Sequence, residues 1–224
     1  MKHLIGGISS GGRALPEIDG HTFSVMRSEG PWLWDSLGVR HVDTAMGFGA
    51  TMLGHAQLEV MTATTAAMLN GPMPSFAHAQ EEAAAAALAT FTGALTQVIF
   101  LNTGSEAVHL ACRTARVATG RRRIVKFAAG YDGWYDSVAF GNAGHACALM
   151  TDDARPEQDG MLLLRYNDFD DAEQLFRDYT DIAALAPGYL KHLSDLAHRN
   201  GALVILDEVL MGLRLCPGLT GTLL

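Results

Sequence analysis

The chain has 224 residues, of which 49% are apolar and 18% are charged, and its formal net charge is −8. This length suits one large domain, or one domain with a small appendage, and the apolar fraction is sufficient for a sizeable core. An acidic chain lacks the clustered Lys and Arg that phosphate contacts need, so nucleic acid is excluded as the expected partner.

Cysteine usage and the absence of long apolar runs bear on the compartment. The three cysteines Cys112, Cys147 and Cys216 follow no metal-ligand spacing, and an odd number is a poor disulfide framework. The first residues lack the apolar stretch of a signal peptide, and no run of about 18 apolar residues occurs. We therefore expect a cytoplasmic protein without a membrane span.

The N-terminal third is predicted to hold irregular chain, a hairpin and two helices. The first 30 residues are rich in Gly and Ser and indicate an arm or loop. Short extended segments at 31–35 and 41–43 enclose Ser36-Leu37-Gly38, which predicts a hairpin. Helices are expected over 56–69 and 78–91, the second around an unbroken alanine run.

From residue 97 onward, apolar strands alternate with amphipathic helices. We expect strands at 97–101, 123–127, 161–164 and 202–206, and helices at 104–119, 170–179 and 187–199. This alternation predicts an α/β domain with a largely parallel sheet. Because such sheets bind ligands at the carboxyl ends of their strands, the residues just after each strand are the candidate site.

Three strand ends carry polar or aromatic residues. Gly104 and Ser105 open a helix, where free N–H groups favour an anion, although Thr103 and Glu106 also form a simple capping box. Tyr131, between glycines, either stacks on a planar ligand or packs in an ordinary loop. Asp207, followed by Glu208, either pairs with a protonated ring nitrogen, caps the strand or binds a metal.

Three ordered blocks of sequence resemble one enzyme family. They are Phe100-Leu-Asn-Thr-Gly-Ser-Glu-Ala107 with Lys126-Phe127 and Tyr131-Asp-Gly133, the N-terminal Trp34-Asp35 with Leu53-Gly54-His55, and Pro187-Gly-Tyr-Leu190 with Leu203-Val-Ile-Leu-Asp-Glu-Val209. Together they resemble the class III aminotransferases that use pyridoxal 5′-phosphate (PLP), and most closely the glutamate-1-semialdehyde 2,1-aminomutase branch. The resemblance covers about residues 30–215.

The resemblance implies a fold and roles for five residues. The fold would be the large domain of a fold-type I PLP-dependent transferase, incomplete here, with residues 1–55 as N-terminal arm and small-domain segment and 56–224 as part of the PLP-binding domain. Roles in holding PLP are implied for the following residues: Gly104 and Ser105 at the phosphate, Tyr131 against the ring, Asp207 at the ring nitrogen and Val209 on the opposite ring face.

The chain departs from the family pattern in three places. Asp132 stands where the family usually has His, and only Leu185-Ala186 remain of a longer strand-and-loop segment. The family's Schiff-base lysine follows the Asp-Glu-Val block, but no lysine follows Asp207 here, and Lys126 and Lys191 match no family position. No catalytic residue is therefore assigned, and we expect these 224 residues to be inactive.

Two functions remain in competition after the sequence is read. The first is PLP-dependent amino-group transfer, by an aminotransferase or aminomutase acting on small amino donors and acceptors as a homodimer. The second is a non-catalytic fragment or paralogue that keeps only cofactor or partner binding. Arg13, in a Ser-Ser-Gly-Gly-Arg stretch that resembles a substrate-side loop, either meets a substrate carboxylate or belongs to a solvated arm. A nucleotide-binding protein is disfavoured, because no Gly-x-Gly-x-x-Gly or Walker motif is present.

Overall fold

The chain divides into two compact units, Met1–Ala77 and His78–Leu224. The computed structural model describes residues 3–9, 17–72, 74–150, 155–185, 190–219 and 221. This division differs from the expected boundary after residue 55, because helix α1 (Leu58–Leu69) belongs to the first unit. The assignment of residues 1–55 to a family small domain stays a prediction.

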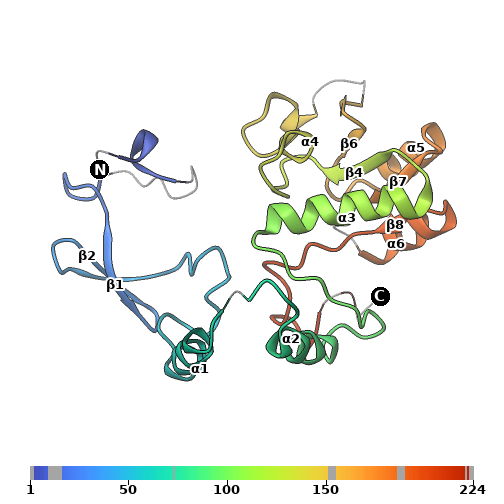
Figure 1. The fold of residues 1–224 in the computed structure, drawn as a ribbon. Coiled ribbons are helices and arrows are strands. Elements are labelled where there is room, and N and C mark those ends of the chain that lie inside the picture. The colour runs from blue at the N-terminus through green and yellow to red at the C-terminus, as the bar shows by residue number, and fades with distance from the viewer. Residues whose placement is uncertain are drawn as a thin grey trace. The chain divides into compact units, whose positions relative to one another are not determined.

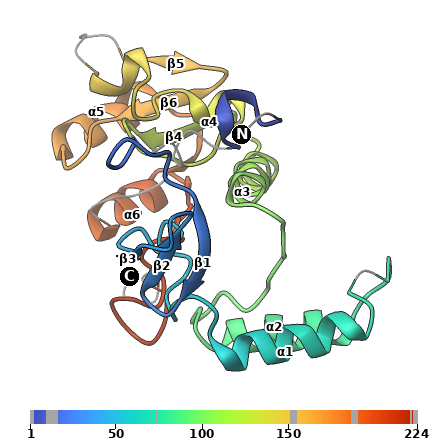
Figure 2. The same ribbon diagram turned by 90° about the vertical axis from the view of Figure 1, so that its left-hand side faces the viewer.

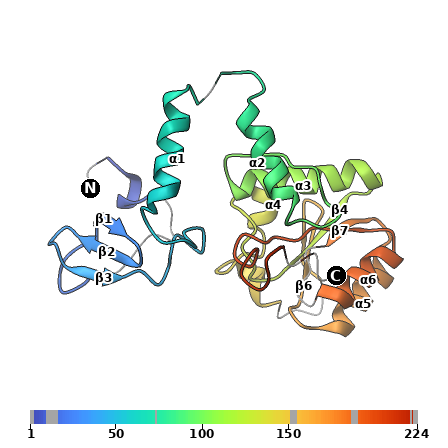
Figure 3. The same ribbon diagram turned by 90° about the horizontal axis from the view of Figure 1, so that it is seen from below.

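The first unit contains a three-stranded antiparallel sheet (Figure 3). Its strands run in the order β1 (Val25–Glu29), β2 (Trp32–Asp35) and β3 (Arg40–Val42), and a short 3₁₀ helix, η1 (Ile5–Gly7), precedes them. The predicted hairpin is confirmed as β2 and β3. The Asp35 carboxylate closes its turn by accepting the N–H of Leu37 and of Val39 at 2.9 and 2.8 Å.

Two helices occupy the middle of the sequence, one in each unit. Helix α1 follows Gln57, whose side chain accepts the N–H of Val60, and helix α2 (Ala79–Ala89) opens the second unit after His78. Both predicted helices are confirmed: α1 begins two residues later than predicted, and α2 begins one residue later and ends two residues earlier. No helix in the described part of the chain is long and apolar enough to cross a membrane.

The second unit is built on a five-stranded sheet in the order β5-β6-β4-β7-β8, of which Figure 2 labels β5, β6 and β4. Its strands are β4 (Arg123–Phe127), β5 (Glu157–Gln158), β6 (Met161–Leu164), β7 (Ile182–Leu185) and β8 (Leu203–Val204). Strands β6, β4, β7 and β8 are parallel, and only the edge strand β5 is antiparallel. The predicted α/β class with a mostly parallel sheet is confirmed.

Helices cover both faces of this sheet (Figure 1). On one face lie α3 (Gly104–Thr119), α4 (Asp136–Ala139) and the 3₁₀ helix η3 (Ala146–Leu149); on the other lie α5 (Phe169–Asp178) and α6 (Leu190–Arg199). Successive side chains of a strand point to opposite faces, so in β4 Ile124 packs with Cys112 of α3, and Val125 packs with Leu175 of α5. Lys126 therefore points to the same face as Ile124.

Some predicted elements differ from the structure. The predicted strand at 97–101 is wrong: these residues are irregular, Ile99 is 73% exposed, and no described strand pairs with them. An apolar run becomes a strand only where another strand satisfies its backbone. The strand predicted at 202–206 is reduced to β8. The last predicted helix is observed from Leu190, since 187–189 lie outside the described residues.

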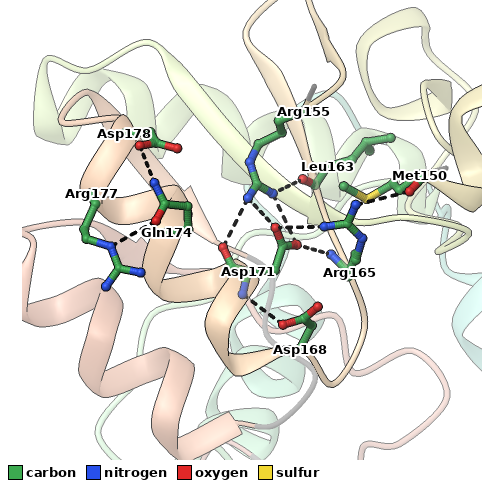
Figure 4. A network of polar contacts seen from close by, with 9 residues as sticks. All are labelled: Met150, Arg155, Leu163, Arg165, Asp168, Asp171, Gln174, Arg177 and Asp178. Atoms are coloured by element: carbon green, nitrogen blue, oxygen red, sulfur yellow. Dashed lines mark hydrogen bonds and ion pairs between the residues drawn. The ribbon is translucent and has the colours of Figure 1, made fainter. Parts of the chain in front are cut away.

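A buried carboxylate joins the end of β6 to the start of α5 (Figure 4). Asp171 is 8% exposed and accepts the backbone N–H of Arg165 at 2.8 Å. The guanidinium groups of Arg155 and Arg165 both pair with it. Asp168 caps the helix by accepting the N–H of Asp171 at 2.9 Å. This network fixes α5 against the sheet, and nothing in the sequence pattern pointed to it.

Candidate functional site

The first turn of α3 presents two backbone N–H groups that are not used by its cap. Thr103 and Glu106 form the predicted capping box, in which the N–H of Thr103 donates to the Glu106 carboxylate at 2.8 Å and the N–H of Glu106 donates to the Thr103 hydroxyl at 3.2 Å. Among the described residues, no acceptor is in hydrogen-bond range of the N–H of Gly104 or Ser105. The cap is therefore compatible with an anion site at the same helix start.

The loop after β4 packs directly on this helix start. A Cβ atom at Gly133 would lie 3.0 Å from the Ser105 hydroxyl oxygen and 3.2 Å from its Cα, and the φ angle of Gly133 is +131°. The N–H of Trp134 donates to the same hydroxyl at 3.3 Å. Only glycine combines this conformation with so close an approach. The structure thus brings Ser105 and the loop of Tyr131 together.

Tyr131 lies two residues before this contact and is 72% exposed. Its ring is therefore not a core residue, which removes the interpretation of a tyrosine packed in an ordinary loop. An exposed ring beside a helix start is available to a flat ligand. The role of Tyr131 stays a prediction, because exposure by itself identifies no ligand.

A buried lysine organises the loop. Lys126 is 2% exposed, and its ammonium donates to the carbonyl oxygens of Gly130 and Val138 at 3.1 and 2.7 Å and to the side-chain oxygen of Asn142 at 2.6 Å. It also forms an ion pair with the carboxylate of Asp132 at 2.9 Å. Four oxygen partners satisfy the buried charge and tie both ends of the loop to β4.

Asn142 links Lys126 to Gly133, the residue that packs on the start of α3. Its side-chain NH₂ donates to the carbonyl oxygen of Gly133 at 3.0 Å. The chain of contacts therefore runs from Lys126 through Asn142 to Gly133, and from there to Ser105. Our sequence reasoning missed these roles. The available signal was a lysine on the buried face of a strand, which requires anionic or carbonyl partners.

Asp207 reaches the same region from the end of β8. Together with Lys126 and Asp132 it lines a small cavity of about 30 Å³, whose other walls include Val108 and Cys112 of α3. One oxygen of its carboxylate accepts the N–H of Val209 at 3.0 Å, which orients the group. The structure thus brings Asp207 together with Lys126 of β4 and Asp132 of the loop after it, and its role at a cofactor stays a prediction.

Two predicted site residues have no such placement. Val209 is 64% exposed, and its only described polar contact is the hydrogen bond to Asp207. Arg13 lies outside the described residues. Their implied roles stay predictions. The metal alternative for the acidic pair gains no support, since no group of three His, Cys, Asp or Glu side chains within the described ranges is arranged to hold an ion.

The α3 side of the cavity carries no charge at neutral pH. Burial raises the pKa of the Cys112 thiol, which is 3% exposed. Burial also raises the pKa of Tyr135, and the neighbouring Cys112 raises it further. The Tyr135 ring stacks on His109 with centroids 4.7 Å apart. The charged groups that line the cavity are therefore Lys126, Asp132 and Asp207.

The other described lysine, Lys191, does not line the cavity. Lys191 is on α6, where its exposed ammonium pairs with Asp195 one helical turn away at 3.2 Å. The amine of Lys126 is buried and engaged with four oxygens. Neither of these two amines is free at the cavity, and the expectation that neither is the family's Schiff-base lysine stays a prediction.

Known proteins resemble the chain along most of its length. The family model for class-III aminotransferases matches residues 16–178. Glutamate-1-semialdehyde 2,1-aminomutase of Rhodopirellula baltica is 32% identical over 232 residues, which cover 95% of this chain and 53% of the relative. The chain thus spans about half the length of the curated relatives it matches.

Solved structures agree with this match. A β-phenylalanine aminotransferase from Variovorax paradoxus superposes with a TM-score of 0.77 at 28% identity, covering 92% of this chain and 49% of its own. A transaminase with PLP bound superposes with a TM-score of 0.72 at 25% identity, covering 85% and 49%. These relatives are PLP-dependent aminotransferases and aminomutases, and the fold is that of the fold-type I large domain. By sequence and by fold, the chain belongs to the class III aminotransferase family.

Proposed function

We propose that the α3 start, the loop after β4 and Asp207 together hold PLP. The observation that carries this proposal is the contact of Gly133 on Ser105, which sets the loop of Tyr131 beside two N–H groups without acceptors in the described residues. Those N–H groups suit a phosphate, and the exposed Tyr131 suits the flat ring. Asp207 suits the basic ring nitrogen, and Val209 is assigned to the opposite ring face.

Bound PLP supplies an electron sink for chemistry at the carbon that carries the amino group. The residues of this chain act on position and charge. Gly104 and Ser105 hold the phosphate through backbone N–H groups, and Tyr131 restricts the ring. The carboxylate of Asp207, fixed by the N–H of Val209, keeps a proton on the ring nitrogen because a close negative charge favours the protonated form.

For the whole protein we propose amino-group transfer between or within small molecules, by an aminotransferase or an aminomutase. The aminomutase relative makes glutamate 1-semialdehyde the first substrate to test. A mutase converts it without an added amino acceptor, whereas an aminotransferase needs one, so the two activities are separated by omitting the acceptor. Product formed only with an acceptor would assign the transferase.

For these 224 residues alone we propose no turnover, because the described lysines are a buried, fully engaged Lys126 and an exposed, surface-paired Lys191. The competing proposal is a paralogue that binds the cofactor or a partner and does not catalyse at all. Assays of this chain and of the longest polypeptide encoded by its gene distinguish the two. Activity in this chain that is lost in Lys126→Ala or Lys191→Ala would contradict the first proposal.

We also propose a cytoplasmic homodimer. Large apolar side chains are exposed in both units, among them Leu58 and Leu69 of α1 at 77% and 83%, and Ile99 at 73%. Large apolar side chains exposed in such number favour association. The three free cysteines suit a reducing compartment. A monomer by light scattering, across micromolar concentrations, would contradict the dimer.

The cofactor site is tested by titrating the chain with PLP and following fluorescence. Asp207→Asn removes the charge at the ring nitrogen, and a charge-assisted hydrogen bond contributes about 1.5–3 kcal/mol. The dissociation constant should rise about tenfold or more. Asp195→Asn, which alters an exposed carboxylate on α6, serves as the matched control and should bind as wild type does. Equal affinities for wild type and Asp207→Asn would overturn the assignment.

A further inference from the structure

We propose that Asp132 is a positioning residue of the cofactor site, which neutralises the Lys126 ammonium and so leaves the Asp207 carboxylate available to the cofactor's ring nitrogen. This inference rests on the proposed function. It assigns a task to the position at which the chain departs from the family pattern, since Asp132 stands where His is usual. Asp132 acts through Lys126 and Asp207 and is not itself a catalytic residue.

The first step is that the Lys126 charge is fixed beside the site. Its side chain is 2% exposed, and two carbonyl oxygens and the Asn142 side chain hold the ammonium at 2.6–3.1 Å. These three oxygens satisfy its hydrogens but carry no formal charge. The carboxylate of Asp132, at 2.9 Å, is the only formal negative charge paired with it in the described part of the chain.

The second step is that Asp207 shares the cavity with this pair. Lys126, Asp132 and Asp207 line one space of about 30 Å³, and the α3 wall contributes Val108 and a neutral Cys112. Lys126 and Asp132 are largely buried whereas Asp207 is exposed, so water screens part of the interaction between Asp207 and the pair. Two carboxylates and one ammonium leave a net negative charge, and the Lys126–Asp132 ion pair leaves it on Asp207.

The third step follows from removing Asp132's charge. An unneutralised ammonium would pair with Asp207, the other carboxylate lining the cavity. Asp207 would then be less able to hold a protonated ring nitrogen, and the ammonium would repel that proton's positive charge. The loop itself should persist, because Asp132→Asn leaves the Gly130, Val138 and Asn142 contacts of Lys126 in place.

The experiment is a double-mutant cycle on PLP affinity. It compares wild type, Asp132→Asn, Asp207→Asn and the double variant by fluorescence titration, with circular dichroism melting of each protein. Asp132→Asn should weaken binding about tenfold in the wild-type background, but less than about threefold in the Asp207→Asn background. A merely structural role of Asp132 in the loop would weaken both backgrounds equally, and that result would overturn the inference.

A charge-rescue variant provides the second arm. Lys126→Gln combined with Asp132→Asn removes both charges, so it should bind PLP more tightly than Asp132→Asn alone. If this double variant binds PLP no more tightly than Asp132→Asn, the inference is overturned. That result would show that the Lys126–Asp132 contact matters for holding the loop and that the charge does not. If Asp132→Asn alone does not fold, the neutral pair, which buries no unpaired charge, is compared with wild type. Its affinity should then lie within about threefold, and a loss of about tenfold or more would overturn the inference.

The cycle also separates this inference from the proposed function. If Asp207→Asn binds PLP as well as wild type does, then the site assignment itself fails. If Asp207→Asn weakens binding but Asp132→Asn acts additively with it, only the inference about Asp132 fails.

Discussion

Substituting Gly133 by Ala should separate the loop after β4 from the start of α3. The φ angle of +131° is strained for any side chain, which costs about 1–3 kcal/mol. The new Cβ would also lie 3.2 Å from both the Cα and the Cβ of Ser105. Since a backbone atom cannot turn aside as a flexible side chain can, overpacking should add about 1–3 kcal/mol.

Gly144→Ala is the matched control, because it isolates the backbone contribution. Gly144 also has a positive φ, +89°, but no atom lies within 4 Å of a Cβ built on it. For a domain of this size each kcal/mol lowers Tm by about 2–4 °C, so Gly133→Ala should melt roughly 2–12 °C below Gly144→Ala. Circular dichroism melting measures this difference, and PLP titration reports on the site.

Gly133→Ala should lose PLP affinity, and Gly144→Ala should not. The Ala side chain should push the loop of Tyr131 away from Ser105, whereas Gly144→Ala should leave binding unchanged. If the two variants melt at the same temperature and bind PLP equally, then the close approach of Gly133 to Ser105 does not shape the site, and the geometric argument for it is refuted.

Two further predictions concern charged side chains away from the site. Asp171→Ala leaves the largely buried Arg155 without its carboxylate and should destabilise the chain by about 3–5 kcal/mol in urea titrations. Asp195→Ala, at an exposed ion pair, should lower the free energy of unfolding by less than about 1 kcal/mol. Equal losses of stability in Asp171→Ala and Asp195→Ala would contradict the importance that we assign to burial of the ion pair. Hydrogen bonding from His55 lowers the pKa of Asp43 below its ordinary 3.8, so the stabilising effect of this pair is full above that pH and is lost as the pH falls through the lowered value. The Tm difference between wild type and Asp43→Asn should therefore shrink below pH 3.8; a difference independent of pH would refute this linkage.

The sequence pattern predicted elements well where the information is local. Helix α3 has its capping box at one end and Gly120 in the left-handed conformation at the other, both recognisable as single residues. Strand β7, by contrast, was not predicted from the sequence. Its Ile182-Ala-Ala-Leu sequence is short and alanine-rich, and alanine is depleted in strands. Its place beside β4 at the centre of the sheet is decided by pairing, which no short window contains.

The same limit applies to the candidate site. Asp207 was predicted because a strand end followed by a polar residue is a local pattern, and the helix start at Gly104 and Ser105 because the Thr103–Glu106 capping box is one. The role of Lys126 was missed because its acceptors arrive from Val138 and Asn142, which are distant in sequence. The wrong strand at 97–101 has a related cause, since its apolar composition was evident but its lack of a described pairing strand was not.

The strand order has a consequence for how the chain folds during synthesis. Strand β4 pairs on one side with β6 and on the other with β7, which begins more than fifty residues after β4 ends. The central strand therefore lacks this second partner until β7 has left the ribosome, a delay of roughly 3–11 s at about 5–20 residues per second. Parallel pairing across such separations is slow. During this interval one edge of β4 is open to wrong partners, so expression yield should depend on chaperones that shield nascent chains.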